Sequence, residues 1–320
     1  MKGKQPIREL KRRVFSRCFL DLNREISRTI LIGGTGRGGT TWASEVINHT
    51  NAYRVLFEPF YPRIHMNLSQ PFPYYPYFRP GTRPAHFTEQ TEAILRGVAP
   101  AYRANSHNRR FFCRTRLIKD IFVNLMMKWM TETFPELRTI LLVRHPFAVA
   151  DSQRQSNWVR DPSDFLKQPD LVSDYLEPFR SLIQEVKTPF EQYVCFWCIE
   201  TLIPLKQFRE GEVYVLFYER LRVDPVGEAG RLFAYLSEPW NATKLQAMVD
   251  HPSITTRKNS PVVLNRDVLT AWERNLSRFE MDRGREILYR FGLDHLYGED
   301  GMPGPGSPFL ATSPDARGAI

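Results

Sequence analysis

The sequence predicts an α/β fold: a single P-loop-like domain in which helices flank a central, mainly parallel sheet of about five strands. Two observations lead to this prediction. Short segments rich in Ile, Leu, Val and aromatic residues alternate along the chain with longer segments of helical periodicity. The first of these apolar segments also runs into a glycine-rich turn, which opens into an amphipathic helix.

The expected strands are short and apolar, as buried parallel strands are. They fall at 29–33, 53–57, 111–118, 138–143 and 212–218. Helical patterns fit 40–48, 122–134, 146–156, 189–209, 225–236 and 267–291, and Pro146 suits the first turn of the third of these. Ligands of such sheets bind at the carboxyl ends of the strands, so we expect the functional residues in the loops there.

Composition divides the chain into parts. Residues 1–28 form a basic segment with nine lysines and arginines, and residues 29–298 form the domain itself. Within the domain, residues 57–87 hold nine aromatic residues and seven prolines. This insertion is either a flat wall for a sugar ring or another planar ligand, or a stiff loop packed on the core. Residues 299–320 are rich in Gly and Pro and are expected to be a disordered tail.

The net charge of +9 indicates an anionic ligand, an anionic acceptor or a negative surface as a partner. The basic segment could contact an anionic membrane or nucleic acid, but a solvated basic helix is the simpler interpretation.

No apolar run is long enough for a membrane span and no signal peptide opens the chain, so a cytoplasmic location is expected. Cys195 and Cys198 lie in an apolar helical run without a nearby histidine, which indicates core thiols.

The glycine-rich turn carries most of the functional information. Gly34 and Gly39 have the spacing of a Walker A loop, and Thr40 and Thr41 follow. The lysine that would contact the phosphates of ATP or GTP is absent, and Arg37 stands inside the loop instead. The turn therefore predicts a phosphate-handling enzyme other than an ATP or GTP hydrolase.

Four segments resemble the sulfotransferases that use 3′-phosphoadenylyl sulfate (PAPS). The segment 37–42 is similar to their 5′-phosphosulfate loop and matches five of its six positions, with Gly38 in place of the usual serine. Residues 140–152 resemble the strand and helix that bind the 3′-phosphate. Residues 256–259 resemble the later Arg-Lys-Gly segment, with asparagine in place of the glycine, and residues 217–221 resemble the Tyr-Glu-Asp-Leu strand end. The resemblance implies a donor site made of Arg37, Gly38, Gly39, Thr40, Thr41, Trp42, Arg144, Ser152, Tyr218, Arg257, Lys258 and Asn259.

The chemistry of these residues suits such a donor. Backbone N–H groups of the turn and the hydroxyls of its threonines can hold the phosphosulfate, and Arg37 can neutralise the charge that develops on the bridging oxygen. Arg144 and Ser152 offer a planar cation and a hydroxyl to the 3′-phosphate. Trp42 either presents a face to adenine or packs in the core beside Val46. Fixed cations can stabilise sulfonate transfer, so no metal is expected.

The general base is not where the cytosolic members of the family have it. Their Lys-Thr-His segment aligns with Lys119 to Ile121, so an isoleucine replaces the histidine. Carbohydrate sulfotransferases use a glutamate, in some cases in a strand-ending Glu-Pro like that of Glu58. Glu58 is therefore the first choice for the general base. The alternative is that Glu58 only forms an ion pair with Arg37 or Lys119. Asp120 and His65 are weaker candidates for the base. Lys119 is expected to stabilise the transferred sulfonate.

The missing histidine, the Glu-Pro element and the aromatic insertion favour a carbohydrate acceptor such as a glycan or glycolipid. Two other classes stay open. A P-loop kinase or NTPase shares the glycine turn but requires the Walker lysine and an acidic residue for magnesium. A non-catalytic basic binding module would depend on the amino-terminal cluster and bind nucleic acid in a salt-dependent way.

Overall fold

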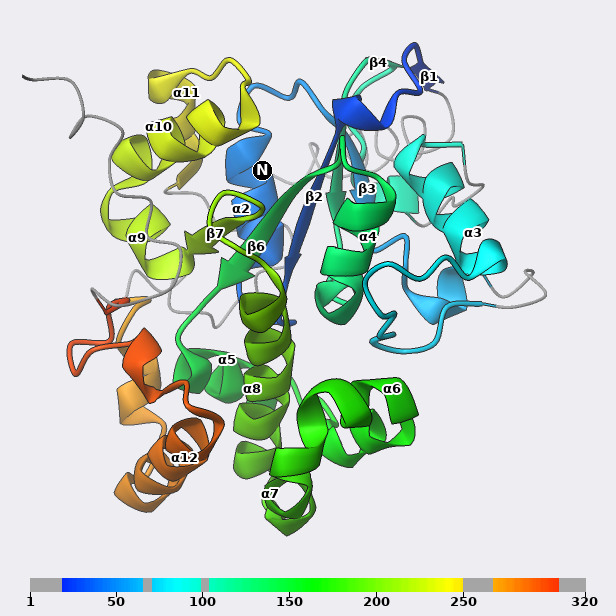
Figure 1. The fold of residues 1–320 in the computed structure, drawn as a ribbon. Coiled ribbons are helices and arrows are strands. Elements are labelled where there is room, and N and C mark those ends of the chain that lie inside the picture. The colour runs from blue at the N-terminus through cyan, green and yellow to red at the C-terminus, as the bar shows by residue number, and fades with distance from the viewer. Residues whose placement is uncertain (1–18, 66–70, 99–103, 250–266, 305–320) are drawn as a thin grey trace, which may run out of the picture.

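A computed structural model of the chain describes residues 19–65, 71–98, 104–249 and 267–304 (Figure 1). Its centre is a five-stranded sheet in the order β3 (Arg54–Phe57), β5 (Arg116–Lys119), β2 (Thr29–Gly34), β6 (Arg138–Val143) and β7 (Tyr214–Phe217). Every neighbouring pair in this sheet is parallel. The predicted α/β fold with a parallel central sheet is confirmed.

The expected strand at 111–118 is divided into two elements. Its first part is β4 (Phe112–Cys113), which pairs in parallel with β1 (Leu20–Asp21) in a separate two-stranded sheet. Its second part is β5 of the central sheet. The two-stranded sheet therefore binds residues near the amino terminus to the rest of the domain.

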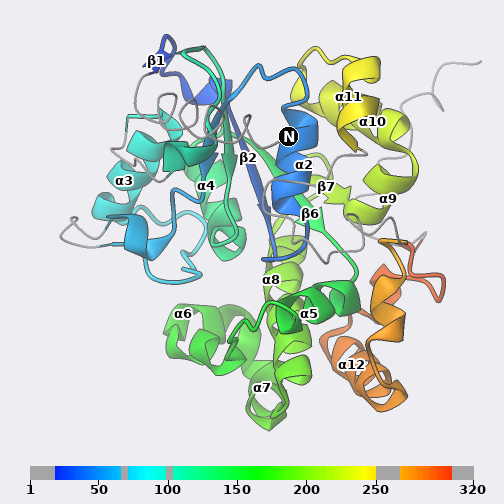
Figure 2. The same cartoon turned by 180° about the vertical axis from the view of Figure 1, so that it is seen from behind.

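Helices cover both faces of the central sheet, as Figures 1 and 2 show. The α-helices are α2 (Thr40–Ile47), α3 (Ala85–Leu95), α4 (Met127–Thr133), α5 (Pro146–Arg154), α6 (Pro169–Leu171), α7 (Arg180–Glu185), α8 (Pro189–Gln207), α9 (Tyr218–Val223), α10 (Pro225–Leu236), α11 (Ala242–Val249) and α12 (Arg278–Phe291). Short 3₁₀ turns are η1 (Ile26–Arg28), η2 (Pro62–His65), η3 (Ala104–His107), η4 (Asn124–Met126), η5 (Pro162–Lys167), η7 (Glu177–Phe179), η8 (Ala271–Arg274) and η9 (Asp294–Leu296), and η6 (Val172–Leu176) is a π-helical turn.

The alternation of side chains along the strands creates two apolar layers. Ile30, Ile32 and Leu142 pack with α2, α10 and α11 on one face. Leu31 and Leu141 point to the other face and pack with α4, α5 and α8. Because both faces are covered, only the strand ends are open to a ligand.

The long helix expected over 267–291 is interrupted. Its first part is the short turn η8, and α12 begins only after Ser277. The Ser277 hydroxyl accepts a hydrogen bond from the Glu280 N–H, and the Glu280 carboxylate accepts one from the Ser277 N–H. This capping box starts a new helix and explains the break.

Cys195 and Cys198 are buried in α8, as expected, and burial raises the pKa of Cys195 to about 12.

Two expected boundaries differ from the structure. Residues 19–28, assigned by composition to the basic segment, belong to the fold, because Ile26 is buried in the core and Asp21 lies in β1. Residues 299–304, assigned to the tail, are also hydrogen-bonded, since the Gly304 N–H donates to the Leu296 carbonyl at 3.0 Å. The sequence pattern does not mark either segment as part of the fold, because the first is rich in charged residues and the second in Gly and Pro.

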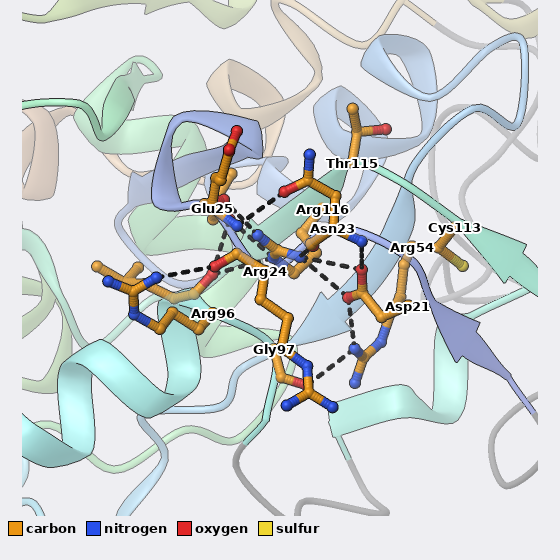
Figure 3. Close-up of polar contacts among 12 residues, drawn as sticks. Asp21, Asn23, Arg24, Glu25, Arg54, Arg96, Gly97, Cys113, Thr115 and Arg116 are labelled. Carbon is orange, nitrogen blue, oxygen red and sulfur yellow. Dashed lines mark hydrogen bonds and ion pairs between the residues drawn. The ribbon is translucent and has the colours of Figure 1, made fainter.

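Asp21 holds two buried arginines at the amino-terminal ends of the strands (Figure 3). Its carboxylate forms ion pairs with the Nη1 atoms of Arg54, at 2.8 Å, and of Arg116, at 3.0 Å. The side chains of Arg54 and Arg116 are 1% and 0% exposed, whereas Asp21 is 8% exposed. Arg116 also donates to the Thr29 hydroxyl at 2.9 Å, so the cluster joins the starts of β2, β3 and β5.

We expect Asp21→Asn to destabilise the chain by about 3–5 kcal/mol, because it leaves two buried guanidinium groups without a counter-charge. Urea unfolding followed by circular dichroism measures the change. Asp282→Asn is the matched control, since Asp282 contacts Arg278 and Arg285 at an exposed position on α12. It should stay within about 0.5 kcal/mol of the wild type. Equal effects of the two substitutions would contradict the role of Asp21.

Candidate functional site

The glycine-rich turn links the end of β2 to the start of α2. Gly34 and Gly39 have φ angles of 150° and 99°, a range that L side chains rarely adopt. A Cβ atom on Gly34 would lie 2.6 Å from the Leu142 carbonyl oxygen, and one on Gly39 would lie 2.7 Å from the Tyr218 ring. Both positions therefore require glycine, and the turn directs the first N–H groups of α2 to the carboxyl edge of the sheet.

Arg37 occupies the middle of this turn in a left-handed conformation, with φ at 72°. Its Nε atom donates to the Ser152 hydroxyl at 3.1 Å. Nearby, the Gln153 side-chain amide donates to the Gly36 carbonyl at 2.8 Å. The structure thus brings the turn into contact with α5, although the two segments are more than a hundred residues apart in the sequence.

Arg144 follows β6 and lies beside the residue that follows β7. Its guanidinium carbon is 4.3 Å from the centre of the Tyr218 ring, and its Nη2 atom donates to the Val268 carbonyl at 3.4 Å. The Nε atom is buried and has no hydrogen-bond partner among the described residues. A buried donor without a partner is unusual and is consistent with a ligand that pairs with it.

Trp42 lies 5.0 Å from Tyr218, ring centre to ring centre, and is 7% exposed. Its indole N–H donates to the Val249 carbonyl at 3.3 Å, and it shares an apolar cluster with Val46. The structure therefore shows the packing role that the sequence left open. Arg257, Lys258 and Asn259, which the resemblance assigns to the donor site, lie outside the described residues, as does the side chain of His65.

Glu58 and Lys119 meet at the ends of β3 and β5. The Lys119 ammonium donates to the Glu58 Oε1 atom at 2.5 Å, and it lies 4.5 Å from the centre of the Phe57 ring. The Lys119 side chain is 4% exposed and that of Glu58 is 19% exposed. One of the ion pairs considered for Glu58 is thus present, and the carboxylate is the partner that remains open to a ligand.

The backbone holds Glu58 in a left-handed conformation, with φ at 49°. Its N–H donates to the Lys119 carbonyl at 2.7 Å, and its carbonyl accepts from the Tyr61 N–H at 3.1 Å. Asp120 fixes the same turn, because its two carboxylate oxygens accept from the N–H groups of Phe60 and Phe122, each at 2.8 Å. Burial raises the pKa of Asp120 to about 7, but its oxygens are enclosed and already bonded, so it positions the turn and does not face a ligand.

His145 caps α5 and shapes the loop after Arg144. Its ring stacks on Trp272 with the ring centres 4.5 Å apart, and burial together with Arg144 lowers its pKa to about 3. The His145 N–H donates to the Glu219 carboxylate at 2.9 Å. Glu219 also accepts from the Tyr297 hydroxyl at 3.1 Å, so this buried residue connects the ends of β6 and β7 to the carboxyl-terminal region.

The aromatic insertion fits both interpretations in part. Phe60, Phe72, Tyr75 and Tyr77 are buried in the core, as a packed loop requires. Tyr74, by contrast, is 46% exposed. It lies 6.0 Å from Tyr61 and 5.9 Å from Phe122, and Tyr61 stacks on Phe122 at 5.2 Å between ring centres. Tyr61 and Tyr74, which pack on the buried Phe122, form an aromatic surface immediately beyond the Glu58 turn.

Sequence reasoning missed a cluster formed by Tyr75, Trp158, Arg160 and Glu200. The Arg160 guanidinium lies over the rings of Trp158 and Tyr75, and a Cβ on Gly36 would be 2.5 Å from the Trp158 ring. The cluster therefore lies against the glycine-rich turn. Its members come from three separate segments, namely the loop around Tyr75, the loop that holds Trp158 and Arg160, and α8, so no local motif marks them.

Strained backbone also marks this region. Of the six non-glycine residues with positive φ in the described chain, four are Arg37, Glu58, Tyr75 and Asn157, and Asn157 immediately precedes Trp158. Such conformations persist where the surrounding structure holds them in place, and they concentrate at functional sites. The strain therefore supports a site between the glycine-rich turn, the Glu58 turn and the Arg160 cluster.

Comparison with known proteins identifies the family. A sequence profile described as "Sulfotransferase family" matches residues 29–242, which is more than half of the chain. The chain belongs to the sulfotransferase family. It is an enzyme that transfers a sulfonate group from PAPS to a hydroxyl, with PAPS as its co-substrate. Among curated proteins, none matches this sulfotransferase by sequence.

Solved structures with a similar arrangement are distant in sequence. The mouse sulfotransferase SULT7A1 complexed with PAP is 12% identical, with a TM-score of 0.47 over 90% of this chain and 90% of its own. Retinol dehydratase in complex with androsterone and inactive cofactor PAP is 14% identical, with a TM-score of 0.46, covering 92% of this chain and 88% of its own. The sulfotransferase domain from the curacin biosynthetic pathway is 13% identical, with a TM-score of 0.43, covering 85% and 99%.

Two further observations concern the described part of the sulfotransferase only. None of its helices there combines the length and apolar character needed to cross a membrane. The same residues hold no group of three or more His, Cys, Asp or Glu side chains arranged to bind a metal ion.

Glu200 leads to a prediction about pH. This carboxyl group is fully buried, and burial raises its pKa from 4.5 to about 8, against the opposing effect of Arg160 and the Thr35 side chain. The folded chain keeps the proton that the unfolded chain releases, so Glu200 makes folding less favourable as the pH rises from about 4.5 to about 8. Glu200→Gln removes this ionisation. We expect the stability of the variant relative to the wild type to increase by at least about 1 kcal/mol between about pH 5 and about pH 8.

Urea unfolding at a series of pH values measures this difference. The control is Glu136→Gln, because Glu136 is exposed at the opposite edge of the sheet, just before β6. Its stability relative to the wild type should not change with pH. A difference between Glu200→Gln and the wild type that is constant over the whole range would contradict the buried, protonated state of Glu200.

Proposed function

We propose that this sulfotransferase sulfates a carbohydrate hydroxyl, with Glu58 as the general base. The observation that supports this most is the Glu58 turn itself. The carboxylate is held by a strained backbone at the carboxyl end of β3, pairs with Lys119 and remains partly exposed. A general base must reach the proton that it removes, and Glu58 is the carboxylate of this edge that can do so.

The donor would lie along the carboxyl edge from the glycine-rich turn to Arg144. The N–H groups at the start of α2 and the hydroxyls of Thr40 and Thr41 would hold the phosphosulfate. Arg144 would hold the 3′-phosphate, because its buried Nε atom is a donor without a partner and its planar group suits a phosphate. Ser152 and Tyr218 contact Arg37 and Arg144 and would complete the two anion sites. By the resemblance to the PAPS-dependent family, Arg257, Lys258 and Asn259 would also contact the 3′-phosphate.

The reaction would then proceed in line. Glu58 takes the proton of the acceptor hydroxyl as its oxygen bonds to sulfur, and the bond from sulfur to the bridging oxygen breaks. Arg37 neutralises the charge on that leaving oxygen, and Lys119 stabilises the sulfonate during transfer. Adenosine 3′,5′-bisphosphate (PAP) is released with the former bridging oxygen.

The carbohydrate acceptor is supported by the aromatic surface of Tyr61 and Tyr74, which packs on the buried Phe122. Sugar rings have apolar faces that pack on exposed aromatic rings, and Tyr74 offers such a ring. The Tyr61 N–H donates to the Glu58 carbonyl, so this surface directly adjoins the proposed base. A labelled-donor assay against glycans, phenols and lipids tests the acceptor class, and turnover of phenols or lipids alone would contradict it.

Glu58→Gln tests the base. The substitution keeps the shape of the side chain but cannot accept the proton, so we expect kcat to fall by roughly 10²–10⁴-fold. Binding of PAP, measured by calorimetry, should remain near that of the wild type. Glu136→Gln serves as the control for a glutamate away from the site. Unchanged turnover in Glu58→Gln would remove Glu58 as the base.

Arg144→Ala tests the 3′-phosphate site. The wild type should bind PAP more tightly than AMP, because only PAP carries the second phosphate. In the variant we expect this preference to fall by about 10–100-fold, the effect of one charge-assisted contact. Calorimetric titration with both nucleotides gives the ratio, and Arg285→Ala, on the exposed face of α12, is the control. A preference that survives in Arg144→Ala would exclude this assignment.

A further inference from the structure

Arg160 lies in an aromatic cage beside the glycine-rich turn. Its guanidinium carbon is 4.5 Å from the ring centres of Trp158 and Phe196 and 5.1 Å from that of Tyr75. Its Nη1 atom donates to the Tyr75 hydroxyl. Rings therefore cover its faces, and one edge is engaged by a neutral hydroxyl.

The other edge of Arg160 carries its Nε and Nη2 atoms. Both atoms are buried and have no hydrogen-bond partner among the described residues. The same two atoms of Arg79 show what this edge binds, since they donate to the two carboxylate oxygens of Asp174, each at 2.8 Å. Buried donors without partners are unfavourable, and this pair has the fork geometry that matches a carboxylate or a sulfate.

The described residues also do not neutralise the charge of Arg160. In the described part of the chain, no carboxylate forms an ion pair with it. Glu200 is the buried carboxyl group of the cluster, and with its pKa raised to about 8 it is mostly uncharged at neutral pH. The cluster therefore carries a net positive charge and attracts an anion.

The position of Arg160 connects it with the acceptor. A Cβ on Gly36 would lie 3.1 Å from its Nη2 atom, so this nitrogen lies close to the glycine-rich turn. Tyr75, whose hydroxyl accepts from Arg160, is close enough to Glu58 for the carboxylate to raise the pKa of the Tyr75 hydroxyl. Arg160 thus lies close to the turn that would hold the phosphosulfate and is linked through Tyr75 to the proposed base.

We propose that the Nε and Nη2 edge of Arg160 binds an anionic group of the acceptor, a carboxylate or a sulfate ester, near the hydroxyl that is sulfated. The inference rests on the proposed function and narrows its substrate class to acidic acceptors. Because both nitrogens are buried and the Trp158 ring lies against Gly36 and Arg160, we expect this ring to move when the anion binds. Trp158 therefore contributes to a binding signal that can be followed by fluorescence.

The experiment compares matched ligands on two scaffolds, with the full chain saturated by PAP. The sugar pair is methyl β-D-glucuronide and methyl β-D-glucoside, and the phenol pair is 4-hydroxyphenylacetate and 4-hydroxyphenylethanol. We expect the acidic member of a pair to bind the wild type at least roughly tenfold more tightly, as one charge-assisted fork would give. Arg160→Gln should abolish this preference, and Arg160→Lys, which keeps the charge without the fork, should retain only part of it.

Arg79→Gln is the matched control, because it removes a partly exposed arginine that is already paired with Asp174. It should keep the full preference for the acidic ligands. Melting temperatures with and without PAP show whether each variant is folded and binds the nucleotide, so loss of the donor site is recognised separately. Turnover with labelled donor shows whether Arg160→Gln raises KM for acidic acceptors while kcat/KM for neutral ones is unchanged.

The outcomes separate this inference from the proposed function. A preference for the acidic phenol that depends on Arg160, without binding of either sugar, would support the anion site and contradict the carbohydrate acceptor. Binding of the sugars without a preference for the acidic one would support the carbohydrate acceptor and contradict the anion site. Absence of an acid preference on both scaffolds would overturn the inference. An equal loss of turnover for acidic and neutral acceptors in Arg160→Gln would also overturn it, because Arg160 would then act on the transferred sulfonate.

Discussion

The parallel pairing of the central sheet is the constraint on which the site depends. Because all five strands point the same way, their last residues and those that follow meet along one edge. Gly34 and Lys119 end β2 and β5, and Glu58, Arg144 and Tyr218 directly follow β3, β6 and β7. An antiparallel strand at any of these positions would end at the opposite edge of the sheet, and the residue that follows it would lie there. The sheet therefore assembles groups from five separate segments before any ligand is present.

The same edge is also where the chain departs from relaxed geometry. Arg37, Glu58 and Tyr75 have left-handed backbones, and Arg144 and Arg160 keep buried nitrogens without partners among the described residues. Each feature lowers the stability of the folded chain, and the well-packed layers around α8 and α2 compensate for it. Unpaired donors of this kind are already oriented, so a bound anion gains contacts without rearranging the cations that hold it.

The sequence was sufficient to locate features that a local motif of neighbouring residues marks. The glycine-rich turn, the strands around it and the Glu-Pro element were located because each has a local pattern, and the structure confirms the parallel sheet that joins them. From the sequence, the ion pair of Lys119 with Glu58 was only one of several roles considered for Glu58. The pair depends on the register between β3 and β5, which places Phe57 opposite Lys119 and which no local pattern reveals. The Arg160 cluster could not be predicted, because Tyr75, Arg160 and Glu200 belong to elements with no shared spacing.

The cluster around Asp21 has a consequence for where the domain begins. The family match starts at residue 29, at the first residue of β2, which suggests a natural point to shorten the chain. Yet the carboxylate that neutralises Arg54 and Arg116 lies eight positions earlier and reaches them through the two-stranded sheet. A fragment that starts at residue 29 would keep the glycine-rich turn and the Glu58 turn but lose the counter-ion of Arg54 and Arg116. We therefore expect the unit that folds stably to extend on its amino-terminal side beyond the segment matched by the family.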